Sequence, residues 1–402
     1  MVAQRIMVAT RRKKIKETVV LQDQLPALGE NEIRMSVDKV GLSTNNVFYA
    51  QMGNAPFLKF FSVYPLQDHK ELANVPAWGL GRVIESNHPE FEVGERFWGF
   101  LHMSNVVQMK AKRTKDGFRA HGGGREKLVP AYNNYTQVID SENAPLSKEG
   151  DLSDLAMTSA PGALSGYTIY ELLKMKGFYD CNAVVFTAAS SKLSLATALF
   201  LQSERQDGTL KKIIGYTSSK NFEFVRSTKL FDEVLTYEET LTGENALHHV
   251  MIDVAGNAEN YKKNKKNLKK ILAVGGTDSS AKSSTFTSFG PSALVKMVAG
   301  MMAPASLRRW LDNKLNPKIE MFFAPSVIAE LIKQMGKAQF NEKQNEALNH
   351  FSKTALEGGW IQVHRCEDIP SAQAAYQKIF SGELKPSEAV ILSLVDVLPG
   401  EA

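Results

Sequence analysis

Two patterns of apolar residues divide the chain. Over the first 145 residues, short apolar runs are separated by polar turns, which is typical of β-strands. From residue 151 onward, segments with apolar residues at helical spacing alternate with short β-branched runs. We therefore expect a β-rich first part followed by helices and strands in alternation. The strands expected in the first part are Ile33–Val40, Leu80–Ser86, Arg96–Phe100 and Glu126–Pro130.

The second part predicts a doubly wound parallel sheet. A helix is expected over Asp151–Lys176, where Ala, Leu and Tyr recur every three or four residues. Strands are then expected at Ala183–Thr187, Lys211–Tyr216, Glu233–Tyr237, His249–Ala255, Lys269–Val274 and Ile319–Phe323. Short strands return at Trp360–His364 and Ala389–Leu394, around a helix at Pro370–Phe380. We expect one β-rich domain (1–150 and 345–402) and an inserted nucleotide-binding α/β domain (151–344).

The segment Ala183–Leu201 predicts a strand, a tight turn and a helix. This is the layout in which a turn and a helix N-terminus receive a dinucleotide pyrophosphate. The usual G-x-G-x-x-G glycines are absent, and Ser190, Ser191, Lys192 and Leu193 occupy this turn. The turn either binds a phosphate group through hydroxyls and an ammonium, or it is a structural connection that binds nothing.

The end of the next strand indicates which dinucleotide would bind. The strand is followed by Thr217, Ser218, Ser219 and Lys220, and the first acidic residue is Glu223. An Asp or Glu at this place would bind the ribose 2′-hydroxyl of NAD, whereas hydroxyls with a basic residue suit the 2′-phosphate of NADP. The sequence therefore favours NADP(H), although such a loop can also be an ordinary solvated turn.

Composition narrows the class of protein. The 402 residues are 43% hydrophobic and 23% charged, with a net charge of +5, which is typical of a globular chain. The basic runs Arg11–Lys16 and Lys262–Lys270 lack interleaved aromatic residues, so we expect solvated surfaces and no nucleic-acid partner. Two distant cysteines provide neither a disulfide framework nor a zinc cluster. With no signal peptide and no membrane span, we expect a cytoplasmic protein without a membrane partner.

The order of segments resembles the medium-chain dehydrogenase/reductase superfamily over nearly the whole chain. The segments that carry this resemblance are Gly79–Gly99, Leu164–Leu173, Asp253–Gly256, Leu272–Thr277 and Ile361–Leu394. The resemblance implies a Rossmann-type sheet with a β-rich GroES-like domain. More narrowly, Asn45–Ala50 together with the glycine-poor turn resembles the DUF2855 family, whose name implies no reaction.

Zinc-dependent members of the superfamily use early Cys and His ligands that this chain lacks. The corresponding segment reads Pro76–Leu80 without the usual His-Glu, and no cysteine precedes Cys181. A catalytic zinc needs three protein ligands and a structural zinc usually four. The chain therefore resembles the zinc-free quinone and enoyl reductases, and we expect no metal.

In zinc-free relatives, NADPH delivers a hydride to an activated double bond or to a carbonyl of a small-molecule substrate. The resemblance places Asn45, Asn46 and Tyr49 where a donor would polarise the acceptor oxygen. Phe48 aligns with a tyrosine of related reductases and cannot donate, so Tyr49 would substitute for it. The alternative is that Asn45 and Asn46 cap a helix and that Tyr49 packs in the core.

The resemblance also implies further cofactor contacts. It assigns Thr168 to the nicotinamide carboxamide, and Gly275 and Thr277 to the nicotinamide ribose. Packing of Thr168 and a simple strand-end turn at Gly275 remain alternatives. Relatives often form homodimers through the nucleotide domain, which here would involve Ser283–Ala299. Two functions follow: an NADPH-dependent reductase, or a nucleotide sensor or scaffold that has kept the fold without catalysis.

Overall fold

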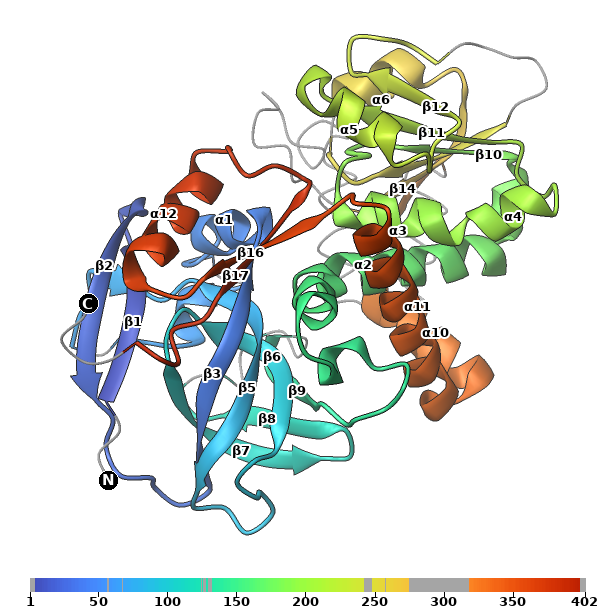
Figure 1. Ribbon diagram of the computed structural model, residues 1–402. Coiled ribbons are helices and arrows are strands. Elements are labelled where there is room, and N and C mark those ends of the chain that lie inside the picture. Colours follow the sequence, from blue (N-terminus) through green and yellow to red (C-terminus); the bar gives the residue numbers. More distant parts are fainter. Residues whose placement is uncertain are drawn as a thin grey trace. The chain divides into compact units, whose positions relative to one another are not determined.

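The chain forms two compact units in the computed structural model, Met1–Thr158 with Ile361–Ala402 and Ser159–Trp360 (Figure 1). The structure describes residues 4–55, 58–66, 68–123, 125, 128, 132–241, 248–256, 258–274 and 318–397. The first unit contains β1 (Gln4–Arg11), β2 (Lys14–Gln24), β3 (Glu32–Leu42), α1 (Thr44–Gln51), β4 (Leu72–Ala73), β5 (Pro76–Ser86), β6 (Arg96–His102), β7 (Val106–Thr114), β8 (Gly117–His121), β9 (Asn134–Gln137), β16 (Gln362–Cys366), α12 (Ile369–Phe380) and β17 (Glu388–Leu392).

The first unit is built on a closed ring of antiparallel strands. Its main sheet has the order β16-β17-β3-β5-β6-β9-β8-β7, and β3 also pairs with β7. Because β3 pairs with both ends of the series β5-β6-β9-β8-β7, these six strands close on themselves and leave an interior filled with apolar side chains. The carboxyl-terminal segment completes this unit, since β17 pairs with β3 and the Tyr376 hydroxyl donates to the Ile15 carbonyl at 2.6 Å.

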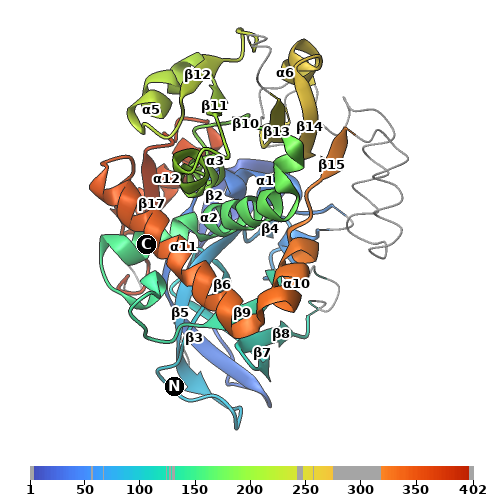
Figure 2. The same ribbon diagram turned by 90° about the vertical axis from the view of Figure 1, so that its right-hand side faces the viewer.

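The second unit is a parallel sheet with helices. Its elements are α2 (Asp151–Met175, which begins in the first unit), β10 (Ala183–Phe186), α3 (Lys192–Phe200), α4 (Gln202–Gln206), β11 (Lys212–Thr217), α5 (Phe222–Ser227), β12 (Glu233–Thr236), β13 (His249–Asp253), α6 (Ala258–Asn264), β14 (Leu268–Ala273), β15 (Ile319–Met321), α10 (Ala324–Met335) and α11 (Lys337–Glu357). Figure 1 shows α2 and α3 below the strands and α6 above them, and α10 lies beside α11 (Figure 2).

The strand order of this sheet is β12-β11-β10-β13-β14-β15, with every pair parallel. In chain order this is 3-2-1-4-5-6, the doubly wound order of dinucleotide-binding domains. The chain reverses direction across the sheet between β10 and β13, so the crevice beyond the carboxyl ends of these strands is the expected ligand position. The predicted fold class, a Rossmann-type sheet with a β-rich domain, is confirmed.

Some elements differ from the sequence prediction. The hairpin β1–β2 precedes the first strand expected from the sequence, and most of β2 is exposed. Lys and Glu on that strand shorten its apolar run, so the alternation is weak. Helix α2 continues through Pro161, although proline cannot donate to the preceding turn. The strand expected at residues 126–130 falls mostly outside the described residues.

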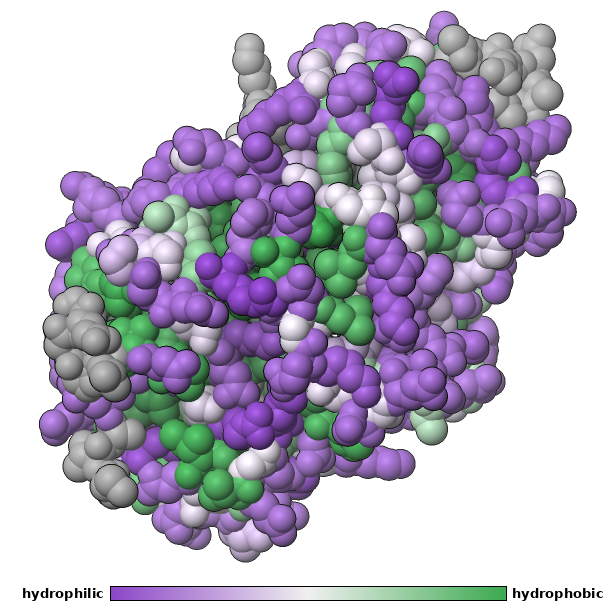
Figure 3. Space-filling view, in the orientation of Figure 1, coloured by the Kyte–Doolittle hydropathy of each residue, from purple (hydrophilic) through white to green (hydrophobic). Residues whose placement is uncertain are grey.

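One face of the molecule is mixed in polarity. Figure 3 shows that hydrophilic residues predominate on it, with several groups of apolar residues between them. Within the described part of the chain, no helix is both long and apolar enough to cross a membrane.

Candidate functional site

The turn after β10, Thr187–Ser191, lies at the carboxyl edge of the parallel sheet, and we call it the nucleotide turn. Thr187 is fully buried, and its hydroxyl donates to the Asp253 carboxylate at 2.7 Å. The same hydroxyl oxygen accepts from the amides of Val254 at 2.8 Å and Ala255 at 3.0 Å. Asp253 also accepts from the Gly256 amide at 3.0 Å. These bonds fix the ends of β10 and β13 to each other. This is the position where the strand order reverses along the sheet.

The second residue of the nucleotide turn has an unusual backbone conformation. Ala188 has a φ of +51°, in the left-handed region that glycine normally occupies. An L-residue with a Cβ is less stable there by about 1–2 kcal/mol. The Ala188 amide donates to the Tyr237 hydroxyl at 2.9 Å, and the Ala189 amide donates to the Tyr216 carbonyl at 2.8 Å. The turn therefore keeps a glycine-like course without glycine.

Helix α3 begins directly after this turn. Ser191 is its N-cap and accepts from the Ser194 amide at 3.2 Å. The Ser190 hydroxyl accepts from the Asn221 amide group at 3.2 Å. Lys192 and Leu193 form the start of the helix, where backbone N–H groups and the helix dipole favour an anion. Burial lowers the pKa of Lys192 to about 8. All four predicted turn residues thus lie at one helix N-terminus.

Helix α2 packs closely against this helix. A Cβ on Gly166 would lie 2.9 Å from the Thr197 hydroxyl and 3.0 Å from the Leu193 carbonyl oxygen, so glycine permits the two helices to approach this closely.

Thr168, also on α2, is buried, and its hydroxyl donates to the Leu164 carbonyl at 2.8 Å. Its oxygen lone pairs can still accept a hydrogen bond. The predicted residues Gly275 and Thr277, and the segment Ser283–Ala299, lie outside the described residues.

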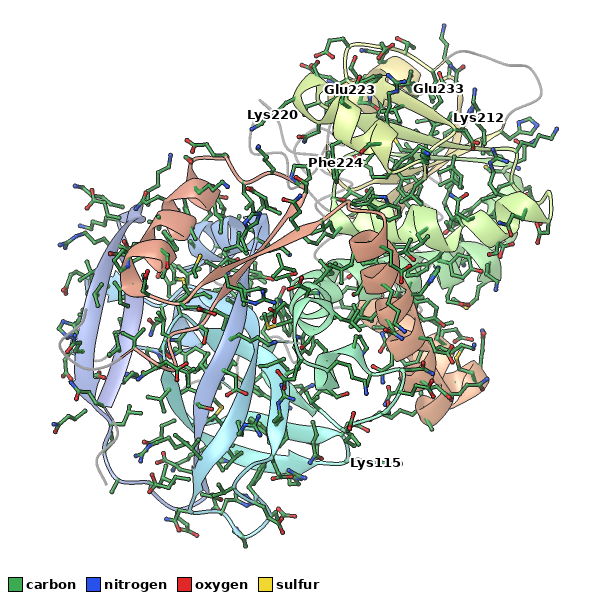
Figure 4. All side chains as sticks on the ribbon, viewed as in Figure 1. Lys115, Lys212, Lys220, Glu223, Phe224 and Glu233 are labelled. Atoms are coloured by element: carbon green, nitrogen blue, oxygen red, sulfur yellow. The ribbon has the colours of Figure 1, made fainter. Side chains whose placement is uncertain are left out.

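The segment Thr217–Lys220 begins at the last residue of β11 and lies at the same edge of the sheet, and we call it the serine-lysine loop. Thr217 is buried at the strand end, whereas Ser219 and Lys220 are exposed. Figure 4 shows Lys220, Glu223 and Phe224 toward one side of the parallel sheet and Lys212 with Glu233 toward the other. Lys212 and Glu233 begin β11 and β12 and form an ion pair at 2.7 Å. A hydroxyl and an ammonium are therefore exposed at the carboxyl edge of the sheet.

In the first unit, the segment that holds the predicted donors is helix α1. Ser43 is its N-cap, and the Asn46 side chain completes a capping box by accepting from the Ser43 amide at 2.8 Å. The Asn46 side chain also donates to the Pro76 carbonyl at 2.9 Å and is buried. Asn45, at the preceding position of the helix, is half-buried. The amide of Asn46 is thus used by the fold, and Asn45 is the more accessible of the two.

Tyr49 lies in a group of rings that we call the aromatic array. Its members are Phe48, Tyr49, Phe60, Trp78, Trp98, Phe100 and Tyr132. The Tyr49 ring lies 4.9 Å from Phe60 and 5.0 Å from Phe100, and its hydroxyl accepts from the Trp78 indole N–H at 3.1 Å. Burial raises the pKa of Tyr49 well above its usual value, so the hydroxyl stays neutral.

The array is partly open to solvent. Phe48 is 39% exposed, and the indoles of Trp78 and Trp98, stacked 4.5 Å apart, are half-buried. Tyr49 itself is only 5% exposed. A neutral hydroxyl that accepts one hydrogen bond still has its own hydrogen to donate. The array therefore combines apolar ring surface on Phe48 and on two stacked indoles with polar donors that include the Tyr49 hydroxyl.

Across the described residues, no group of three or more His, Cys, Asp or Glu side chains is arranged to hold a metal ion. His102 is buried and packs its ring 4.4 Å from that of Tyr64. Burial lowers its pKa well below the usual value, and the charges of Arg5 and Arg125 act in the same direction.

Several residues of the site were missed by the sequence reasoning. Tyr237 was predicted only as a strand end, and Asp253 only as part of a motif, yet both hold the nucleotide turn. Trp78 was considered only as part of a segment that lacks zinc ligands, although its indole N–H donates to Tyr49. The signal that could have found Tyr237 and Asp253 is their common place at the carboxyl ends of parallel strands.

Comparisons with known proteins agree with this architecture. The profile of a family described as "Protein of unknown function (DUF2855)" matches residues 40–385. No protein of curated function matches the sequence. CurA from Vibrio vulnificus in complex with NADPH is similar in structure, with 12% identity, coverage of 97% of this chain and 99% of that chain, and a TM-score of 0.53.

Two further solved structures are similar. The yhdH oxidoreductase from Salmonella enterica in complex with NADP has 11% identity, covering 98% of this chain and 100% of that chain, with a TM-score of 0.52. The quinone oxidoreductase from Coxiella burnetii has 12% identity, the same coverages and a TM-score of 0.51. At these identities the likeness establishes the fold.

Proposed function

The chain belongs to the DUF2855 family, and from its fold and site we propose that it is an NADPH-dependent reductase. It would transfer a hydride to the double bond or carbonyl of a small apolar substrate, such as an enone, quinone, aldehyde or ketone, without zinc. The observation that carries the proposal is the serine-lysine loop at the carboxyl edge of a sheet with the 3-2-1-4-5-6 order.

The residues at this edge suit NADPH. Ser219 and the Lys220 ammonium would bind the 2′-phosphate, and Thr217 would lie under the ribose. The first acidic residue, Glu223, comes three positions after Lys220, in the first turn of α5, so no carboxylate occupies the strand end where it would repel a phosphate. The similar structures of CurA and of the yhdH oxidoreductase contain NADPH and NADP, which supports the same cofactor here.

The nucleotide turn would hold the pyrophosphate. The N-terminus of α3 is formed by Ser190, Ser191, Lys192 and Leu193. Glycines would let the backbone come closer to the pyrophosphate; here the charge of Lys192 would attract it instead. Thr168 would accept from the nicotinamide carboxamide, and Gly275 and Thr277 would line its ribose. When bound, NADPH would supply the hydride.

The first unit would bind and polarise the substrate. The aromatic array would offer the stacked indoles of Trp78 and Trp98 and the exposed ring of Phe48 to a planar apolar acceptor. Tyr49 is neutral, and its hydroxyl would donate to the acceptor oxygen as negative charge develops there. Asn45 is the accessible second donor, whereas Asn46 would act by holding α1 in place.

The cofactor assignment can be tested by titrating the protein with NADPH and NADH and following reduced-nicotinamide fluorescence. We expect NADPH to bind more tightly, and Lys220→Ala to weaken NADPH about 10–100-fold, as loss of a charged hydrogen bond does, while leaving NADH unchanged. Lys115→Ala is the matched control, because it removes the same charge from an exposed turn of the first unit (Figure 4). Equal losses for both cofactors, or for both variants, would refute the role of Lys220.

Zinc independence needs its own measurement. We expect protein purified in the presence of a chelator to contain less than about one zinc per ten chains and to retain full turnover, because hydride acceptance would rely on hydrogen-bond donors. Turnover that disappears with the chelator and returns with added zinc would overturn this part of the proposal.

One observation favours a second function, a nucleotide sensor or scaffold without catalysis. Asn46 is used by the helix cap, and Tyr49 is almost fully buried with its hydroxyl already bonded to Trp78. A sensor would bind NADPH but not oxidise it with any enone or quinone. The reductase would show at least slow oxidation with one member of a panel of planar acceptors, so the two functions are separable by the same assay.

A further inference from the structure

We propose that Tyr237 is a positioning residue for the nucleotide turn, and that its hydroxyl replaces the conformational freedom that a turn glycine would give. The inference rests on the proposed function for its effect on NADPH. The claim that the Tyr237 hydroxyl holds the turn in its conformation rests only on the geometry of the second unit.

Three consecutive amides of the turn are held by three different segments: β13, β11 and the residue that follows β12. The Thr187 amide donates to the Ile252 carbonyl of β13 at 3.1 Å, and the Ala189 amide to the Tyr216 carbonyl of β11 at 2.8 Å. The Ala188 amide, between them, donates to the Tyr237 hydroxyl at 2.9 Å. Of the three, only the bond at the left-handed residue uses a side chain as its acceptor.

The position of Tyr237 explains how it reaches the turn. It follows β12, which ends at Thr236, and β11 separates β12 from β10 in the sheet. The Tyr237 side chain therefore extends past the end of β11 to the turn that follows β10. Its ring is parallel to that of the buried Tyr216, at 6.4 Å between centroids and 6° between planes. A side chain packed in this way holds its hydroxyl in a fixed place.

The turn has little room to relax around this bond. A Cβ on Gly215 would lie 2.8 Å from the Ala189 Cβ, so the turn rests directly on β11. Ala188 is left-handed without the tolerance of glycine. If the Tyr237 hydroxyl is removed, the Ala188 amide loses its acceptor and the left-handed conformation loses its support. The backbone leading into the first turn of α3 should then shift, and with it Ser191 and Lys192.

The test is a double-mutant cycle on NADPH affinity, measured by nicotinamide fluorescence, with Tyr237→Phe and Ala188→Gly. We expect Tyr237→Phe to weaken binding about tenfold and Ala188→Gly to change it less than about twofold. In the Ala188→Gly background, adding Tyr237→Phe should cost less than about threefold, because glycine adopts the left-handed conformation unaided. Tyr170→Phe is the control, since that hydroxyl bonds Glu204 at 2.9 Å elsewhere in this unit.

Three results would overturn the inference: unchanged affinity in Tyr237→Phe, tighter binding, or the same loss in both backgrounds. A wild-type protein that binds no nicotinamide cofactor would instead refute the proposed function. In that case, hydrogen exchange at the Ala188 amide decides the inference. Slow exchange in the wild type that becomes at least about tenfold faster in Tyr237→Phe, with the Tyr170→Phe control unchanged, supports it, and equal exchange rejects it.

Discussion

The nucleotide turn and helix α1 both carry polar side chains, but the two regions use them differently. At the turn, strand order brings Ser190, Lys192 and Lys220 to one edge, because parallel strands all end there. In α1, Asn46 and Tyr49 turn toward the fold and use their polar groups to hold the helix cap and an indole. Capping thus uses polar side chains at both helix starts, Ser191 at α3 and Asn46 at α1, whereas Ser219 and Lys220 stay exposed beyond the end of a parallel strand.

The largest expected effect is on kcat, and it tests whether the Tyr49 hydroxyl acts on the substrate or only supports the fold. If its hydroxyl donates to the substrate, Tyr49→Phe should lower kcat about 100-fold or more, while NADPH affinity stays unchanged. Turnover of a quinone or enone accepted by the wild type measures this. Tyr376→Phe is the control, because it removes a buried hydroxyl of the same unit that donates to Ile15. A kcat within twofold of wild type would make Tyr49 a core residue only.

The next effect is on stability, and it distinguishes Asn45 from Asn46. Asn46→Ala removes the capping bond to Ser43 and the bond to Pro76, so it should lower the free energy of unfolding by about 2 kcal/mol. Asn45→Ala should change it by less than about 0.5 kcal/mol, because the side chain of Asn45 takes part in neither of these bonds. Urea unfolding of both variants measures the difference. Equal losses would mean that Asn45 also supports the fold.

The charge of Lys192 should make cofactor binding depend on pH. With a lowered pKa of about 8, the ammonium is charged below this pH and neutral above it. NADPH affinity should therefore fall about tenfold between pH 7 and pH 9, as the attraction for phosphate is lost. Lys192→Arg should remove this dependence, because arginine stays charged. A pH-independent wild type would show that Lys192 does not contact the phosphate.

The smallest expected effect concerns Thr168. If its hydroxyl oxygen accepts from the nicotinamide carboxamide, Thr168→Val should weaken NADPH about threefold, which is within the net range of one neutral hydrogen bond. Thr197→Val is a close control, since both hydroxyls donate to the carbonyl four residues earlier at 2.8 Å. The same affinity for the two variants would assign Thr168 to packing.

The sequence predicted the parallel sheet well because its signals are local. Each strand is a short apolar run, and the residues that follow it fall at one edge once the strands are parallel. The role of Tyr237 could not be predicted in this way, since its partner Ala188 lies 49 positions away and is reached past the end of another strand. At α1 the sequence allowed both a donor role and a capping role, because asparagine serves either equally well. The hairpin β1–β2 was missed because the polar face of β2 hides its alternation.

The pairing of β3 with β17 also has a consequence for the order of synthesis. Val40–Leu42 pair with Val390–Leu392, so the end of β3 that leads into α1 waits for about 350 further residues. At typical elongation rates this wait lasts roughly 20–70 s. During that time this strand edge stays open to wrong partners while the nascent chain leaves the ribosome. The second unit, encoded in one continuous stretch, can finish before the first, and truncation of the last strand should therefore impair the earliest-made part of the protein.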